Sequence, residues 1–98
     1  MNMQAIMQQA KKMQNDMLKT KEEIDNRVFE ASSSFVSVKV NGKKDVLEIK
    51  IDNESIESDE IEMLQDMLVV ALNQAYKKVD EYTDEKMAKY NSMMPGLF

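Results

Sequence analysis

The stretch FVSVKVNGKKDVLEIKI, residues 35–51, has the pattern of a β-hairpin. Apolar side chains occupy every second position over residues 36–40 and again over residues 47–51. An alternation of period two is typical of strands that bury one face. Asn41 and Gly42, between the two runs, form the residue pair that best tolerates positive φ angles in a tight turn. We therefore expect two antiparallel strands joined by a turn at these two residues.

A further strand is predicted before the hairpin. The segment RVFEA, residues 27–31, has strand-forming character, and the serines at 32–34 are suited to the turn that follows it.

The segment upstream of the sheet has a helical repeat. When Met3 is taken as position a of a heptad, apolar residues fill almost all a and d positions, and only one of these positions is polar. Such a repeat is typical of a helix with a coiled-coil-like seam, so we expect a helix from about Met3 to Arg27. The seam residues are Met3, Ile6, Ala10, Met13, Met17, Thr20 and Ile24.

The last third of the chain also predicts a helix. Asp59 and Glu62 form a capping-box-like start, and acidic residues there suit the helix dipole. Apolar residues then recur at spacings of three and four from Ile61 to Tyr82. We expect this helix over residues 59–91, with Pro95 and Gly96 in a tail over residues 92–98.

These elements predict a single α+β domain over residues 1–98. The first helix covers 1–27, a small antiparallel three-stranded sheet covers 28–52, and the last helix covers 59–91. One face of so small a sheet cannot cover both helices. We therefore expect a homodimer, because a second copy would cover the seam of the first helix. The predicted interface residues are Met3, Ile6, Ala10, Met13, Met17 and Ile24.

Composition narrows the class of protein. The 98 residues contain no cysteine, which excludes disulfides and favours a reducing compartment. The first residues lack the apolar core of a signal peptide, and no window approaches the roughly 18 apolar residues of a membrane span. The expected localisation is cytoplasmic.

Charge is distributed unevenly along the chain. Residues 1–53 hold nine Lys/Arg against eight Asp/Glu, whereas residues 54–98 hold four against ten. The asymmetry is compatible with a basic binding surface beside an acidic remainder, and equally with solubility alone.

The residues of enzymes and metal sites are largely absent. Without His or Cys, the chain has no Ser-His or Cys-His nucleophile and no zinc site built on those ligands. The acidic run DNESIESDEIE, residues 52–62, fails as a calcium loop, because Glu57 stands where glycine is required and Ile56 where a ligand is required. The ten methionines are explained by packing more simply than by copper binding. We expect no catalysis, no metal and no cofactor.

Three segments carry a family resemblance. MQQAKKMQNDM at residues 7–17, FVSVKVNGKKDVLEIKID at 35–52 and LQDMLVVALNQAYKKVDEYTDEKM at 64–87, followed by PGLF, are similar in order and spacing to the YbaB/EbfC family of bacterial nucleoid-associated proteins. The resemblance implies an α-β-β-β-α subunit, a tweezer-shaped homodimer, and binding of double-stranded DNA at the nucleoid. The chain departs from the family at residues 31–35, which lack the usual glycines, and after Asp52, where the usual proline is missing.

The resemblance also implies which lysines face DNA. They would bind phosphates as point charges and would not read base sequence. The primary candidates are Lys11, Lys12 and Lys19, and the secondary ones are Lys43, Lys44, Lys77 and Lys78. Lys12 and Lys19 are seven residues apart and so share one outer face of the first helix.

A second interpretation keeps the fold and changes the function. A net charge of −5 becomes −10 in a dimer, so DNA binding requires the lysines to be segregated from the acids. Without that segregation, the chain would be a dimeric protein-interaction module that uses its acidic last helix.

Overall fold

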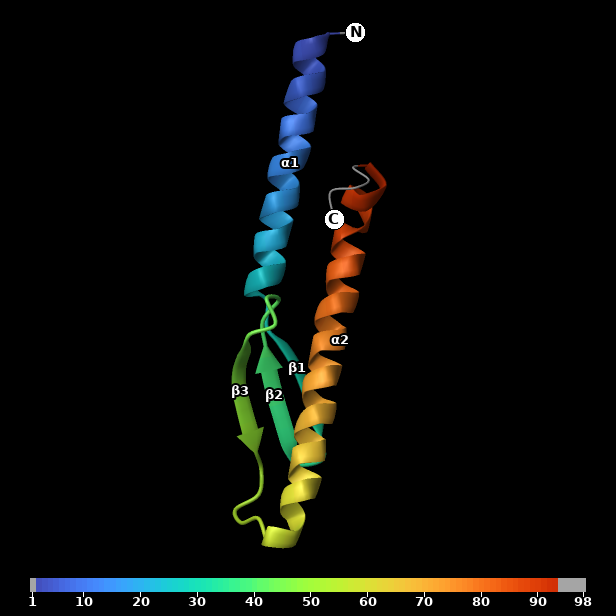
Figure 1. The fold of residues 1–98 in the computed structure, drawn as a ribbon. Helices are drawn as coiled ribbons and strands as arrows, with labels where there is room; N and C mark the ends of the chain where they lie inside the picture. Colours follow the sequence, from blue (N-terminus) through green and yellow to red (C-terminus); the bar gives the residue numbers. More distant parts are fainter. Residues whose placement is uncertain (1, 94–98) are drawn as a thin grey trace.

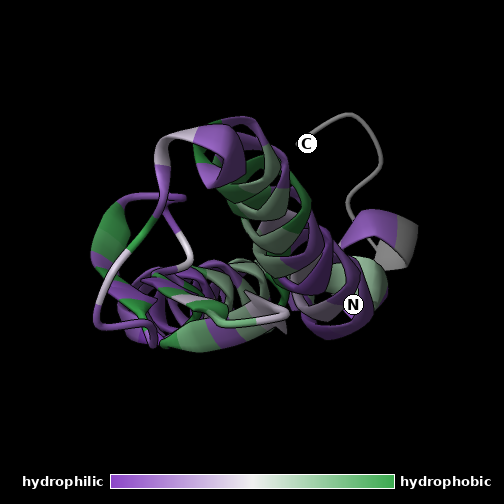
Figure 2. Ribbon diagram, turned by 90° about the horizontal axis from the view of Figure 1, so that it is seen from below, coloured by the Kyte–Doolittle hydropathy of each residue, from purple (hydrophilic) through white to green (hydrophobic). Residues whose placement is uncertain are grey.

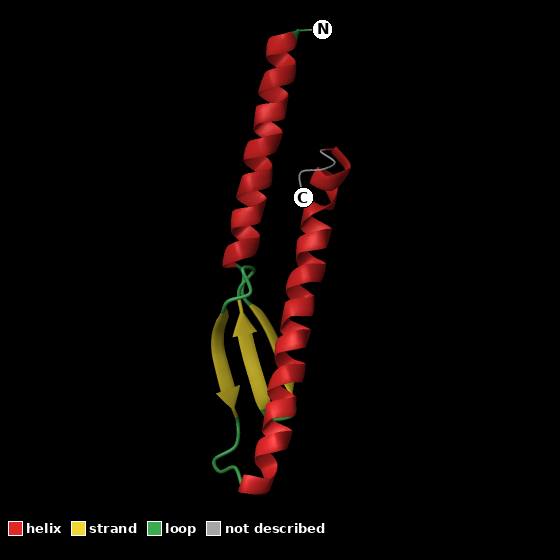
Figure 3. Cartoon of the chain, viewed as in Figure 1, coloured by secondary structure: helices red, strands yellow, loops and turns green. Residues whose placement is uncertain are grey.

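The computed structural model describes residues 2–93 of the chain. The elements follow in the order α1 (Met3–Asn26), β1 (Phe29–Ser33), β2 (Val36–Val40), β3 (Val46–Ile51), η1 (Ser58–Glu60) and α2 (Ile61–Met93). The strands form one antiparallel sheet in the order β1-β2-β3, beside the first half of α2 (Figures 1 and 3). This α+β arrangement of helix, three strands and helix confirms the predicted fold of the subunit.

The core lies between the sheet and α2. Val36, Val38 and Val40 point from β2 toward α2 and are almost fully buried. Ala71 and Ala75 face them from the helix, and their small side chains let α2 lie close to the sheet. The alternation that predicted the strand therefore marks its buried face.

Element boundaries differ from the prediction at several points. β1 begins and ends two residues later, because Ser32 and Ser33 pair with β2 and the turn falls on Ser34, where φ is 53°. The capping interaction before α2 also lies two residues earlier, where the Glu60 carboxylate accepts a hydrogen bond from the Glu57 backbone N–H at 3.3 Å. α2 continues to Met93, and the rest of the predicted tail lies outside the described residues.

The hairpin loop is longer than the predicted two-residue turn. It spans residues 41–45, and the positive φ belongs to Lys44, at 67°, and not to Gly42. The side-chain oxygen of Asn41 accepts hydrogen bonds from the backbone N–H groups of Lys43 at 2.9 Å and Asp45 at 3.0 Å. The prediction for this turn is wrong because the Asn41 side chain closes a wider loop.

Gly42 has a different role from the predicted one. A Cβ atom at this position would lie 2.5 Å from the carbonyl carbon of Ile24 and 2.9 Å from the Cα of Asp25. Both atoms belong to the backbone at the end of α1. Gly42 is therefore the point at which the hairpin loop packs directly against the base of α1.

α1 packs on α2 through a second cluster. Met17 and Ile24 are buried with Met87 and Tyr90, and Met13 packs beside them. This half of the predicted seam is covered within the chain, because α2 extends well past the end of the sheet (Figure 1). A second copy is therefore not needed to cover Met17 and Ile24. Met3, Ile6 and Ala10 remain exposed.

Thr20, the polar member of the seam, has a partner on α2. Its hydroxyl lies 3.2 Å from the hydroxyl of Tyr90, whose side chain is buried. We expect Thr20→Val to lower the free energy of unfolding by about 1–2 kcal/mol, because it leaves a buried hydroxyl unpaired. Tyr90→Phe should cost less, because Thr20 is only half-buried and can bind water. In urea titrations the double variant should be no less stable than Thr20→Val alone; additive losses would contradict the hydrogen bond.

Candidate nucleic-acid interface

The first helix projects as a basic arm, which we define as residues 3–21. Every residue from 2 to 12 is exposed, and Figure 1 shows these turns extending beyond the end of α2. The arm carries four lysines and a single acid, Asp16. Among the described residues, none of these lysines makes an ion pair. They are Lys11, Lys12, Lys19 and Lys21.

Two of the predicted lysines form a line along the arm. Lys12 and Lys19 are both exposed and are separated by two helical turns. Residues seven apart lie about 20° from each other around the helix and about 10 Å apart along it. Their ammonium groups are thus offered to the same side.

The other predicted lysines are mostly engaged within the chain. Lys44 lies 2.9 Å from the Asp80 carboxylate, and Lys77 lies 3.9 Å from that of Glu81. The Lys78 ammonium donates to the Glu30 carbonyl oxygen at 2.6 Å. Of these four, only Lys43 has no such partner in the described part of the chain. The structure therefore does not gather the seven candidates into one surface.

The outer face of the sheet is neutralised internally. Lys39 lies 3.3 Å from Glu48 and 3.4 Å from Glu30, its neighbours on the flanking strands. Hydrogen bonds to Glu48 and then to Glu30 raise the pKa of the Lys39 ammonium above its ordinary value. This face offers little net charge to a polyanion.

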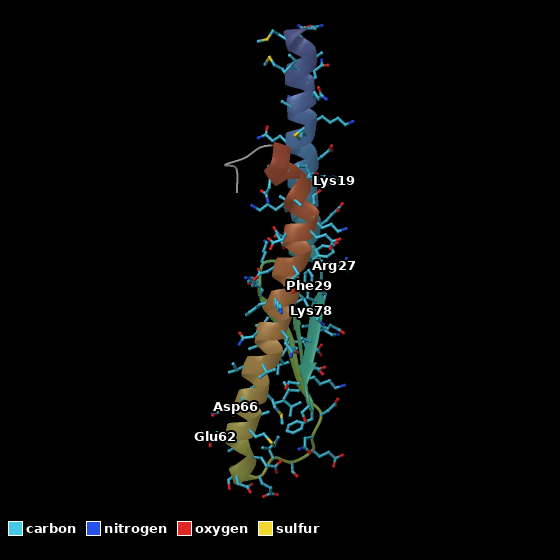
Figure 4. All side chains as sticks on the ribbon, turned by 90° about the vertical axis from the view of Figure 1, so that its right-hand side faces the viewer. Lys19, Arg27, Phe29, Glu62, Asp66 and Lys78 are labelled. Carbon is cyan, nitrogen blue, oxygen red and sulfur yellow. The ribbon has the colours of Figure 1, made fainter. Side chains whose placement is uncertain are left out.

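Acidic residues gather at the end of the molecule opposite the arm. Residues 52–66 include seven Asp/Glu and no Lys or Arg. The molecule is 71 Å long, and Figure 4 shows Glu62 and Asp66 far from Lys19. Exposed charges are largely screened beyond about 8 Å at physiological ionic strength. The acidic end therefore does not cancel the field of the arm.

Sequence reasoning missed a cationic cluster at the base of the arm. The Arg27 guanidinium lies 4.2 Å from the centre of the Tyr82 ring, and its Nη1 donates to the Tyr82 hydroxyl at 3.2 Å. The Lys86 ammonium lies 5.3 Å from the same ring. The spacing of Tyr82 and Lys86, four residues apart on a helix, could have indicated half of this cluster. Nothing in the sequence connects Arg27 to it.

Sequence reasoning also missed an apolar strip beside the core. Ile49 and Ile51 pair with Val38 and Val36 and so share their face of the sheet, yet both are exposed because α2 contacts only β1 and β2. Val69 lies on the same side, because it is two helical turns before Tyr76, which bonds to the loop before β3. The apolar strip is Leu47, Ile49, Ile51 and Val69. Figure 2 shows hydrophobic segments on the left-hand side, where β3 lies in Figure 1.

The described residues include neither a membrane-spanning helix nor a cluster of metal ligands. No helix is both long and apolar enough to cross a membrane. No group of three or more acidic side chains is arranged to hold a metal ion within that part of the chain.

Comparisons with known proteins agree on one family. The model of the YbaB/EbfC DNA-binding family matches residues 1–94. A nucleoid-associated protein of Ligilactobacillus salivarius is 41% identical over 99% of this chain and 95% of its own length. One from Clostridium novyi is 43% identical over 100% and 90%, respectively. The crystal structure of an uncharacterised Helicobacter pylori protein aligns with a TM-score of 0.68 at 25% identity, covering 95% of this chain and 98% of that one.

Proposed function

Because the chain belongs to the YbaB/EbfC DNA-binding family, we propose that it binds double-stranded DNA as a homodimer, with the arm lysines in contact with phosphates. It is a nucleoid-associated DNA-binding protein and not an enzyme. The observation that carries the proposed contact is the distribution of charge: among the described residues the arm lysines make no ion pair, and seven acids of residues 52–66 lie at the opposite end of the molecule.

The binding mode follows from the side chains available. Lysine contacts a phosphate as a point charge and carries little sequence information. The arm contains no arginine, the side chain most often used to read guanine in the major groove, although Gln4, Gln8 and Gln9 lie near its exposed end. We therefore propose little sequence preference, with dissociation constants of roughly 10⁻⁴ to 10⁻⁶ M at physiological salt.

We place the two-fold contact of the homodimer at the apolar strip. Exposed apolar surface that continues a core is the usual position of a subunit interface, and β3 is also an edge strand with unpaired backbone groups. Self-complementary packing about a two-fold axis would cover the strip of both copies. The exposed part of the seam, Met3, Ile6 and Ala10, remains the alternative interface.

The salt dependence of DNA binding tests the placement of the contact. Each phosphate contact that is lost flattens the log–log dependence of affinity on salt by about 0.9, and a symmetric dimer loses each contact twice. Lys12→Gln with Lys19→Gln should therefore flatten the slope by up to about 3.6 and weaken binding to all duplexes alike. Lys43→Gln with Lys44→Gln should do less, because Lys44 is already paired with Asp80.

Titrations of duplex DNA at low and moderate salt distinguish an error in the placement of the contact from an absence of DNA binding. A larger effect from the hairpin pair would show that the arm is not the main contact. If wild-type protein has no duplex affinity at low salt, the DNA-binding proposal fails and the protein-interaction module becomes the better explanation.

A further inference from the structure

We propose that Arg27, Tyr82 and Lys86 form a binding site for a backbone phosphate of duplex DNA at the base of the arm. The inference rests on the proposed function and deepens it. It adds a contact where α1, β1 and α2 meet, which neither the sequence pattern nor the family match assigns.

The geometry brings two cations to one aromatic ring. Arg27 follows the last residue of α1 and caps it, donating its backbone N–H to the Ile24 carbonyl at 3.1 Å. This anchors the residue at the start of β1, and its guanidinium stacks on Tyr82. Lys86, one turn after Tyr82, brings its ammonium to the same ring. Because the guanidinium lies 4.2 Å and the ammonium 5.3 Å from the ring centre, the two cationic groups are less than about 10 Å apart.

The two cations of the cluster are not held in ion pairs. Within the described residues, neither Arg27 nor Lys86 has a carboxylate oxygen within 4.0 Å. Glu22 and Glu23 line the same shallow depression as Arg27, but they make no ion pair with it. Both cations are exposed, so an incoming phosphate can reach them. A guanidinium presents several donors in a plane and is well suited to holding a phosphate that a neighbouring ammonium also attracts.

The cluster continues the line of arm lysines. Lys19 and Arg27 line one depression, and Figure 4 shows them one below the other along the long axis. Lys12, Lys19 and Arg27 are spaced by seven and eight residues, or about 10 and 12 Å along a helix. A duplex lying along this line would meet the three positions within about seven base pairs. The arm and its base can then hold one duplex together.

A purely structural role explains only part of the cluster. Arg27 alone could fasten the end of α1 to Tyr82 through its stacking and hydrogen bond. Lys86, however, makes no hydrogen bond or ion pair in the described part of the chain, and its ammonium lies beside the Tyr82 ring. A second cation near the first would weaken such a fastening by repulsion, whereas an anion close to both would favour both.

The test compares Arg27→Gln, Arg27→Lys and Lys86→Gln in duplex titrations over a range of salt. Each glutamine variant should flatten the log–log slope by up to about 1.8, because the dimer would lose its contact with one phosphate in each subunit. Arg27→Lys keeps the charge and should keep most of the slope. Lys50→Gln, an equal loss of charge on the outer face of the sheet at a lysine paired with Asp52, is the matched control and should leave the slope unchanged.

The outcomes separate this site from the proposed function. If wild-type protein binds DNA and Lys86→Gln leaves the slope unchanged, the phosphate site is wrong while the proposed function stands. Equal weakening by Arg27→Lys and Arg27→Gln, without a change of slope, would assign Arg27 a structural role and overturn its part in the site. Absence of wild-type binding would overturn both. Should Arg27→Gln fail to fold, Lys86→Gln decides alone, because Lys86 is exposed and makes no hydrogen bond to any described residue.

Discussion

Gly42→Ala is expected to destabilise the protein by about 3 kcal/mol, which lowers the Tm of a domain this size by roughly 12–24 °C. The new Cβ would meet the carbonyl carbon of Ile24 at 2.5 Å and the Cα of Asp25 at 2.9 Å. Both are backbone atoms, so the clash cannot be relieved by a side-chain rotation. Either the hairpin loop or the end of α1 must move, and the packing of α1 on α2 is disturbed with it. Thermal unfolding followed by circular dichroism measures the effect.

A second substitution at Gly42 distinguishes close packing against α1 from a requirement for positive φ as the reason for the glycine. Asparagine adopts positive φ readily, so Gly42→Asn would be tolerated if backbone conformation were the reason for the glycine. Close approach to α1 predicts instead that Gly42→Asn is at least as damaging as Gly42→Ala. Lys43→Ala, in the same loop and exposed, should leave the Tm unchanged. Wild-type stability in Gly42→Ala would show that the loop can stand away from α1.

Ile49→Glu is expected to convert the homodimer into folded monomers, raising the dissociation constant by about 100-fold or more. Ile49 is 47% exposed in the single chain, so a glutamate there remains solvated in the monomer. At a two-fold interface the same charge would be buried without a partner, which costs several kcal/mol. Sedimentation equilibrium at micromolar concentration gives the association state, and circular dichroism establishes that the monomer is folded.

The opposite face of β3 provides the matched control. Lys50→Glu changes the adjacent residue on the outer face of the sheet and should leave the dimer intact. If Ile49→Glu remains dimeric while Ile6→Glu dissociates, the interface lies on the exposed seam of α1 instead of the apolar strip. A wild-type chain that sediments as a monomer would remove the homodimer altogether.

The order and type of the elements could be predicted because each has a local periodicity. The alternation of Val36, Val38 and Val40 matches their burial, and the recurrence from Leu64 to Tyr82 matches the face of α2 that packs on the sheet, whereas Ile61 is exposed. What could not be predicted depends on long-range contacts. Nothing near Gly42 in the sequence indicates that the end of α1 lies against it. The burial of Met17 and Ile24 likewise depends on how far α2 continues past the sheet.

The candidate DNA-binding site likewise has a part that could be predicted from the sequence and a part that could not. Lys12 and Lys19 share a face because helical geometry alone requires it, and the structure leaves both exposed and unpaired in the described residues. Lys44 was an equally reasonable choice from its position at the hairpin tip. Its neutralisation by Asp80 arises from the packing of the loop against α2, which no local pattern encodes. The same holds for Arg27, whose ring partner is 55 residues away.

The elongated shape has a practical consequence for measuring the association state. The radius of gyration is 19.6 Å, whereas a compact chain of this length would have one of about 13 Å. Elution from a gel-filtration column follows hydrodynamic size and not mass, so a single chain would elute ahead of compact standards of equal mass. A monomer calibrated in this way would be read as a dimer, and a dimer as a larger assembly. Mass-based methods such as light scattering are therefore the ones that can count the chains.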